Sequence, residues 1–391
     1  MKSEWKKYSL GEVCSQIYSG GTPSTRHKEY WNGDLRWLSS GETSQRFIYD
    51  TERKITQKGV ENSSTKLANK GCTVVATAGQ GHTRGQASFL MIETYMNQSV
   101  IACEANPNYV LPLYLYYNLD SRYEEFRLLS DGTSTRGGLS GKILKRMDIK
   151  LPPLDEQKNI SKILKVLDNK IILNRKINDN LEQQAHQLFI KLFSGCNPDT
   201  PLGNVVETTS GGTPSRKHIE YYEDGSICWV KSKELLGGYI HNTEEHINDL
   251  AIKKSSAKIL PKHSVLIAMY GATVGAYALT SKPMSCNQAV CALLENDKYP
   301  YTYLFQIAKE FQHYLVNLAV GSAQQNISQV LIKQLPIYSN IEIIKEYHSL
   351  AQPLHQQIEK LQAENIVLSD IRDTLLPKLM SGEIDVSEIK I

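Results

Sequence analysis

The sequence predicts an α+β protein with two homologous mixed α/β domains, joined by two long antiparallel coiled-coil helices and related by approximate two-fold symmetry. Two observations predict this architecture. The segment Ser-Gly-Gly-Thr-Pro-Ser at residues 19–24 recurs letter for letter at residues 210–215. Each copy is followed by a long segment with apolar residues in heptad spacing. We therefore divide the chain into a globular domain (1–152), a helical spacer (153–197), a second globular domain (198–337) and a second helical spacer (338–391).

Further matches keep the same order in both halves, so the repeat is long. Trp37 corresponds to Trp229, and Asn97-Gln98 corresponds to Asn287-Gln288. Two copies of about 190 residues are far longer than the 20–50 residue periods of solenoid repeats. The chain should therefore carry two similar sites, and these sites need not bind the same thing.

The first predicted helix runs from Asp155 to Phe193, a stretch without Gly or Pro. Apolar residues recur in it at alternating steps of four and three, which is typical of a coiled-coil seam. Two asparagines fall on this seam and should favour one register at a cost in stability. The expected seam residues are Ile160, Leu164, Leu167, Ile171, Asn174, Asn178, Leu181, Leu188 and Leu192.

The second predicted helix has the same rhythm, with seam residues Leu354, Leu361, Leu368, Ile371 and Leu375. Pro353 predicts a kink or a broken first third, because an interior proline removes a helical hydrogen bond. Neither stripe has another partner of comparable length. We therefore expect the two helices to pack on each other and to hold the globular domains at opposite ends of a rod. Packing of each helix on its own domain is the alternative.

The composition places bounds on function. The 391 residues carry a formal net charge of +3, and no basic tail is present. If the protein binds nucleic acid, it uses local patches or a basic partner. The seven cysteines form no C-x-x-C pair, which favours reduced thiols in the cytoplasm. No stretch reads as a signal peptide or a membrane span.

The motifs that would indicate catalysis are incomplete. The segment Asn106–Tyr109 lacks the second proline of an amino-methyltransferase loop, and residues 132–138 lack the Lys-Ser/Thr of a phosphate loop. His241 and His246 are five residues apart, whereas a helical zinc pair needs a spacing of four. We therefore expect no catalytic residue, no metal and no cofactor bound by this chain.

The polar loops of both globular domains suit contacts with DNA. Arg can bind guanine and Asn or Gln can bind adenine, while Lys, Ser and Thr position phosphates. The framework letters of the two copies match and the loop letters differ, which favours two readers of different sequences over ordinary solvated loops. The shared Gly-Gly-Thr-Pro and Trp are better explained as a scaffold turn and core. The candidate DNA-binding residues are Thr22, Ser24, Arg26, Lys28, Arg36, Arg46, Gln80, His82, Arg84 and Arg136 in the first domain, and Thr213, Ser215, Arg216, Lys217, Lys231, Lys233, Tyr270, Thr273, Gln324, Gln325 and Asn326 in the second.

Three segments carry a family resemblance. They are residues 19–37 with their second copy, the spacer entry Leu-Pro-Pro-Leu-Asp-Glu-Gln at 151–157, and the closing Leu-Leu-Pro-Lys-Leu-Met-Ser-Gly-Glu-Ile at 375–384. On these segments the whole chain resembles the specificity subunit of type I restriction-modification systems. The second spacer entry, residues 335–338, lacks Pro-Pro-Leu and Glu-Gln, which leaves the start of the second helix open.

The resemblance implies a non-catalytic subunit whose two target-recognition domains each bind one half of a bipartite, asymmetric DNA site. It implies that the paired helices fix the spacer and dock two modification subunits, which methylate adenine N6 with S-adenosylmethionine. Restriction subunits that use ATP and Mg would complete the complex. Two alternatives are a methyltransferase enzyme, against which the missing cofactor loop argues, and a two-headed coiled-coil adaptor that binds proteins and does not read DNA.

Overall fold

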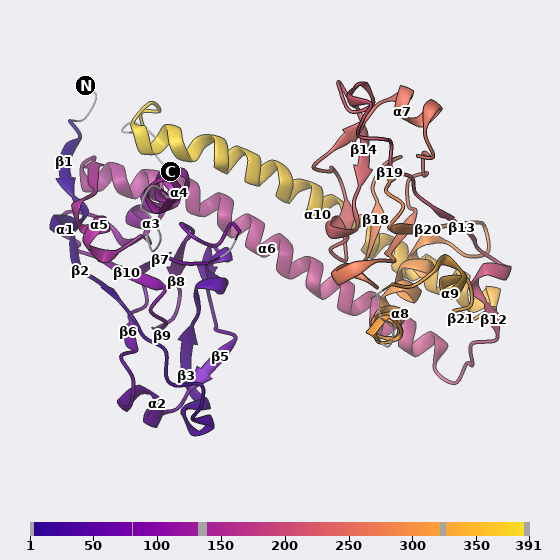
Figure 1. The fold of residues 1–391 in the computed structure, drawn as a ribbon, viewed down its shortest axis with the longest axis horizontal. Helices are drawn as coiled ribbons and strands as arrows, with labels where there is room; N and C mark the ends of the chain where they lie inside the picture. Colours follow the sequence, from indigo (N-terminus) through magenta and orange to yellow (C-terminus); the bar gives the residue numbers. More distant parts are fainter. Residues whose placement is uncertain (1–3, 80, 132–138, 321–325, 387–391) are drawn as a thin grey trace. The chain divides into compact units, whose positions relative to one another are not determined.

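The computed structural model describes residues 4–79, 81–131, 139–320 and 326–386, and it divides into two compact units (Figure 1). The first unit combines Met1–Asn169 with Leu368–Ile391, and the second is Lys170–Val367. Two long helices, α6 (Leu154–Phe193) and α10 (Ile341–Ser381), each contribute residues to both units. The first unit is therefore discontinuous in sequence, and the second lies within it along the chain.

The first unit contains two main sheets. A five-stranded sheet has the order β2 (Cys14–Ser19), β10 (Val100–Ala105), β7 (Thr73–Ala76), β8 (Ala87–Leu90) and β4 (Phe47–Ile48). A four-stranded sheet has the order β5 (Arg53–Ile55), β3 (Trp31–Leu38), β9 (Thr94–Met96) and β6 (Lys66–Ala68). Strands β1 (Lys6–Ser9) and β11 (Asp148–Leu151) form an antiparallel pair. The short helices are α1 (Leu10–Val13), α2 (Gln57–Glu61), α3 (Pro112–Asp120), α4 (Tyr123–Asp131) and α5 (Gly141–Arg146).

The second unit repeats this plan. Its five-stranded sheet has the order β13 (Glu207–Ser210), β20 (Val290–Leu294), β17 (Val265–Ala268), β18 (Tyr277–Thr280) and β15 (Tyr239–Ile240). A smaller sheet joins β16 (His246–Ile247), β14 (Ile227–Val230) and β19 (Ser285–Cys286), and β12 (Thr200–Pro201) pairs with β21 (Pro336–Ile337). The helices are α7 (Asp249–Lys254), α8 (Tyr301–Val320) and α9 (Gln329–Lys333). In both five-stranded sheets the last pair is parallel and its neighbours are antiparallel, which confirms the repeat at the level of topology.

Helices α6 and α10 pack antiparallel within each unit. In the second unit, Asn174 Nδ2 donates to Glu364 Oε2 (2.8 Å) and Asn365 Oδ1 (3.0 Å), while the ring of Phe189 lies 5.5 Å from that of Tyr347. Residue numbers therefore rise on one helix as they fall on the other. Asn174 is fully buried, and Asn178 is also buried. Both asparagines thus lie on the packed face, where the heptad pattern predicted them.

The packed face departs from the predicted seam by one residue at several turns. Asp168 is buried and Leu167 only half-buried, because the Asp168 carboxylate pairs with Arg372 in the first unit. Arg372 likewise takes the place expected for Ile371, which is 43% exposed. Phe189 and Phe193 are buried among tyrosine rings, with Leu188 and Leu192 half-buried beside them. Of the other predicted seam residues, Ile160, Leu164, Ile171 and Leu361 are buried and Leu181, Leu354, Leu368 and Leu375 are half-buried.

Pro353 does not break α10, which is helical from Ile341 to Ser381. Proline deprives the carbonyl of the residue four positions earlier, Ser349, of its helical hydrogen bond. Both residues are exposed, so water can bind that carbonyl. The expected interruption is therefore absent because the proline lies on the solvated side of the helix.

Replacing Asn174 with Leu should raise the free energy of unfolding of the second unit while loosening the register of the helix pair. Burying the Asn174 amide costs free energy, which its hydrogen bonds to Glu364 and Asn365 offset only in part. Hydrogen exchange of residues 170–193 in the full chain measures the effect, with the exposed Gln183→Leu as the control. Faster exchange in Asn174→Leu than in the wild type would show that these hydrogen bonds stabilise the pair on balance.

Candidate nucleic-acid interface

A buried scaffold supports the polar loops identically in both units. Trp37 Nε1 donates to the carbonyl of Gly21 (3.2 Å), and Trp229 Nε1 donates to that of Gly212 (3.0 Å). The preceding position must also be glycine, because a Cβ on Gly20 would lie 1.9 Å from the carbonyl oxygen of Met96. The Gly-Gly turn and the tryptophan therefore form the scaffold of each unit, as their conservation between the copies suggested.

A second set of shared contacts fixes the turn that follows the tryptophan. The carboxylate of Glu42 accepts hydrogen bonds from the backbone N–H of Ser39 and of Glu52, both at 2.8 Å. Glu234 accepts the corresponding pair from Lys231 (2.7 Å) and Glu244 (2.8 Å). These carboxylates hold backbone and are not candidates for contact with DNA.

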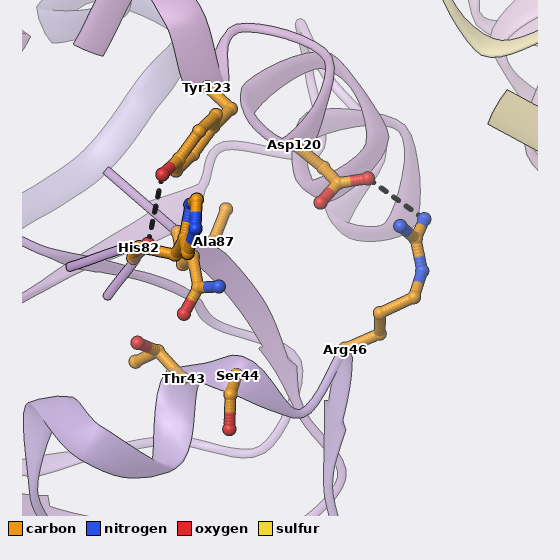
Figure 2. A pocket seen from close by; sticks show the side chains of 8 residues that line it. Thr43, Ser44, Arg46, His82, Ala87, Asp120 and Tyr123 are labelled. Atoms are coloured by element: carbon orange, nitrogen blue, oxygen red, sulfur yellow. Dashed lines mark hydrogen bonds and ion pairs between the residues drawn. The ribbon is translucent and has the colours of Figure 1, made fainter. Parts of the chain in front are cut away.

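A pocket of about 350 Å³ in the first unit gathers two segments that the sequence singled out and a third that it did not (Figure 2). Thr43, Ser44 and Arg46 follow β3, His82 and Ala87 belong to the loop and strand after β7, and Asp120 and Tyr123 come from α3 and α4. Figure 2 shows the Arg46 side chain reaching the Asp120 carboxylate at the side of this pocket. The pocket therefore brings the predicted residues Arg46 and His82 near each other.

Arg46 is held by acidic side chains of the protein and is not free to read bases. Its Nη2 lies 2.8 Å from Asp120 Oδ2 and its Nε 3.4 Å from Asp168 Oδ1. Burial raises the pKa of the Asp120 carboxyl, and the Arg46 charge opposes this rise. A contact with DNA would have to break two largely buried ion pairs, so we assign Arg46 a structural role in place of the predicted one.

The loop before β8 is anchored to α4 through its backbone. Tyr123 Oη donates to the carbonyl of His82 (3.0 Å), and Arg127 Nη1 donates to that of Gly81 (2.8 Å). These contacts leave the His82 side chain exposed, whereas Arg84 is half-buried and makes interactions of its own. The neighbouring candidate Gln80 lies outside the described residues. Helix α4 thus positions this loop, which the sequence alone did not indicate.

Replacing Tyr123 with Phe should release one anchor of that loop and cost about 1 kcal/mol locally, the usual net contribution of such a hydrogen bond. We expect roughly fivefold faster amide exchange in residues 81–86, measured by mass spectrometry on the full chain. Tyr109→Phe is the matched control, since Tyr109 is 42% exposed and lies outside this loop. Unchanged exchange in Tyr123→Phe would mean that Arg127 holds the loop alone.

In the second unit, cationic candidates gather around one carboxylate. Arg216 Nη2 lies 2.5 Å from Glu245 Oε2, and Lys231 Nζ binds Glu245 Oε1. Burial alone would raise the pKa of Glu245, but hydrogen bonds from these two cations lower it below its ordinary value. Arg216 also lies over the Tyr222 ring, 4.3 Å from its centroid. The Glu245 carboxylate therefore stays charged near neutral pH.

The other candidates lie on the surface with few constraints. Thr22 and Thr213 each donate to the amide oxygen of Gln98 or Gln288, while Thr273 donates to the carbonyl of Tyr270. Lys233 pairs with Glu244 (2.6 Å), and Asn326 forms a β-bridge with Tyr270. Ser24, Arg26, Lys28, Arg36, Ser215 and Lys217 are exposed. Arg136, Gln324 and Gln325 lie outside the described residues.

A larger cleft of about 1040 Å³ lies in the second unit, between its helices and residues 233–244. When the two halves of the repeat are aligned, Gly238 corresponds to Arg46 and Lys309 corresponds to Asp120. The arginine that lines the first pocket thus has no counterpart in the second cleft, which residues of α6 and α10 also line. The sequence repeat already shows that glycine replaces Arg46 in the second half. It could have indicated a more open cleft there if Arg46 had been recognised as a side chain that fills space.

Within the described ranges, no three His, Cys, Asp or Glu residues converge in a way that would hold a metal ion. Among the helices that the structure describes, none combines the length and apolar character needed to cross a membrane.

A family model described as "Type I restriction modification DNA specificity domain" matches residues 2–183 and 199–339. The chain belongs to this family. One match falls in each half of the repeat, so each half contains one specificity domain. The Trp and Gly-Gly scaffold described above is therefore a scaffold of the specificity domain in this chain.

Relatives of this specificity-domain protein span the whole chain. The MjaIX specificity subunit of Methanocaldococcus jannaschii is 27% identical, over 99% of this chain and 98% of its own length. The HindI specificity subunit of Haemophilus influenzae is 23% identical, over 98% of this chain and 100% of its own. A crystal structure of a type I restriction-modification S subunit from M. genitalium has the same fold, with a TM-score of 0.61, 17% identity and 96% coverage of both chains.

Proposed function

We propose that this chain is the DNA-recognition subunit of a type I restriction-modification complex. Each unit would bind one half of a bipartite, asymmetric site, and the complex would act on DNA through other subunits. The observation that carries the proposal is the contrast between the two units. Their buried scaffold is the same, contact by contact, while the polar side chains above it differ.

The helices suit a role in fixing the spacer and in docking two modification subunits. Polar contacts in the packed face, such as Asn174 with Glu364, oppose a shift in register. Apolar side chains such as Leu173 and Val367 are more than half exposed on the same helices, as expected of a surface that binds protein. In this proposal the chain works in the cytoplasm and binds no cofactor, and the partner subunits supply S-adenosylmethionine, ATP and Mg sites.

Sequencing of adenine methylation in cells tests the function. Cells that express this chain with its cognate modification subunit are compared with cells that lack this chain. We expect a new bipartite motif only when this chain is present, with both half-sites and the spacer read at once. Unchanged methylation in the presence of an active modification subunit would contradict the proposal.

The adaptor alternative is tested on the purified complex. DNA recognition through cationic side chains requires affinity for duplex DNA to fall steeply with salt, because phosphate contacts release counterions. The exposed apolar side chains on the helices do not separate the two hypotheses, because an adaptor would also need them to bind its partners. Binding of the modification subunit without any salt-dependent DNA binding would favour the adaptor.

A further inference from the structure

The exposed side chains of Arg36, Asp50 and Lys54 form a cluster on the outer face of the four-stranded sheet in the first unit. This sheet, like its three-stranded counterpart in the second unit, is called the small sheet below. Arg36 on β3 lies opposite Lys54 on β5 in the strand register. Arg36 Nε donates to Asp50 Oδ1 at 2.8 Å, and the two side chains are 42% and 63% exposed. Asp50 thus orients the guanidinium through Nε, which leaves its two terminal nitrogens for a bidentate contact.

The second unit has the same three places with different chemistry. Cys228 on β14 lies opposite His246 on β16, just as Arg36 lies opposite Lys54. Cys228 is buried, however, whereas Arg36 is exposed. Asn242 stands in the place of Asp50, and its Oδ1 accepts from Cys228 Sγ (3.4 Å) and His246 Nε2 (2.8 Å). All three residue pairs are 192 positions apart. The cluster carries a net charge of +1 in the first unit and is neutral in the second when the histidine is neutral.

A neighbouring site differs in the opposite respect. Both units place an arginine over an aromatic ring there, although the arginine comes from different sequence positions. The guanidinium of Arg53 lies 3.7 Å from the Trp31 ring centroid in the first unit. In the second unit Arg216 lies over Tyr222, the counterpart of Trp31. Arg53 corresponds in sequence to Glu245 and Arg216 to Thr25, so the cation comes from a different strand or loop in each unit.

This contrast separates two kinds of DNA contact. Phosphate contacts carry no sequence information and need only a cation in the right place, whereas base contacts need particular donors and acceptors. A cation that persists in both units fits the first kind. A cluster that keeps its place but changes its charge and hydrogen-bonding groups fits the second.

We infer that the outer face of the small sheet distinguishes the two half-sites, with Arg36, oriented by Asp50, donating to a guanine in the half-site of the first unit. Arginine binds guanine O6 and N7 bidentately, and a neutral Asn-His-Cys cluster offers no equivalent fork. Arg53 and Arg216 then bind phosphate in their respective half-sites. The inference rests on the proposed function and adds to it which residues set the difference in sequence preference.

The test sequences adenine methylation in cells carrying the full complex with Arg36→Ala. We expect the preference for guanine at one position of the first half-site to fall about tenfold, with the second half-site unchanged. Arg36→Lys should weaken the same preference while it keeps the positive charge, because lysine cannot make the bidentate contact. Arg53→Ala should weaken binding to all sequences about equally and reduce the salt slope by about one phosphate contact.

The control is the exposed ion pair Lys7–Asp148, with side chains 63% and 62% exposed, on another sheet of the first unit. The variant K7A/D148A should leave both half-sites as they are. An unaltered motif in Arg36→Ala, or equal loss at both half-sites, would overturn the inference. If Arg36→Ala is unstable, Arg36→Lys decides. A wild-type complex that yields no bipartite motif refutes the proposed function itself, and the inference with it.

Discussion

Replacing Asp168 with Ala should lower the free energy of unfolding of the first unit by about 3–5 kcal/mol, the usual cost of removing one partner from a buried ion pair. Asp168 is 2% exposed. Its carboxylate lies 3.0 Å from Arg372 Nη1 and 3.4 Å from Arg46 Nε, and it accepts a hydrogen bond from Tyr117 Oη at 2.7 Å. The substitution leaves the two guanidinium groups without this shared partner in a desolvated place.

Urea denaturation of the full chain, with hydrogen exchange to assign the change to α3 and α6, measures this effect. Asp373→Ala is the matched control, because Asp373 binds the same Arg372 but is 57% exposed, and surface pairs contribute about 0–1 kcal/mol. Replacing Asp168, Arg46, Arg372 and the second Arg46 partner, Asp120, together by apolar residues should restore much of the loss. Equal losses for Asp168→Ala and Asp373→Ala would refute the buried-network account.

Lowering the pH from about 6.5 to about 4 should destabilise the second unit through His355 by about 3 kcal/mol. Burial, with the charges of His348, His263 and Lys309, lowers the pKa of His355 from 6.5 to about 4. Over this range the unfolded chain binds a proton that the folded chain does not. Stability from this group is therefore complete above pH 6.5 and is lost as the pH falls toward 4.

The surroundings of His355 explain why it stays neutral in the folded unit. The rings of Tyr301 and Phe305 meet it edge-on at 5.8 and 5.4 Å, and Tyr239 Oη lies 3.4 Å from Nδ1. His355→Gln should flatten the pH dependence of exchange in α8 relative to the wild type. The exposed His313→Gln is the control. A His355→Gln profile that still follows the wild type would assign the acid loss to other groups.

The repeat, the two long helices and the buried asparagines could be predicted from sequence, because heptad spacing and matching letters are local signals. The predicted seam failed at Asp168 and Arg372, since a pattern of apolar letters cannot show that two charges far apart in sequence will bury each other. The ion pairs of Arg46 could not be predicted for the same reason. Its partners Asp120 and Asp168 lie in α3 and α6, and only the tertiary structure brings them together.

The candidate interface was predicted in part. The shared Gly-Gly turn and tryptophan were assigned to the scaffold by comparing the copies, and Trp37 does bond to that turn. The base-reading role of any loop residue stays a prediction. The cross-strand cluster of Arg36 with Lys54 was missed because no local sequence signal links the two residues. Only the register of β3 and β5 places them side by side.

The discontinuity of the first unit sets an order of events during synthesis. Its first 169 residues leave the ribosome before the second unit, but its last segment begins only at Leu368. At 5–20 residues per second, roughly 10–40 s pass while the intervening 200 or so residues are made. During that interval the ion pair between Asp168 and Arg372 cannot form. Only Arg46 and Tyr117 can bind the Asp168 carboxylate until then, so the ion-pair network of the first unit is completed by the last helix, α10.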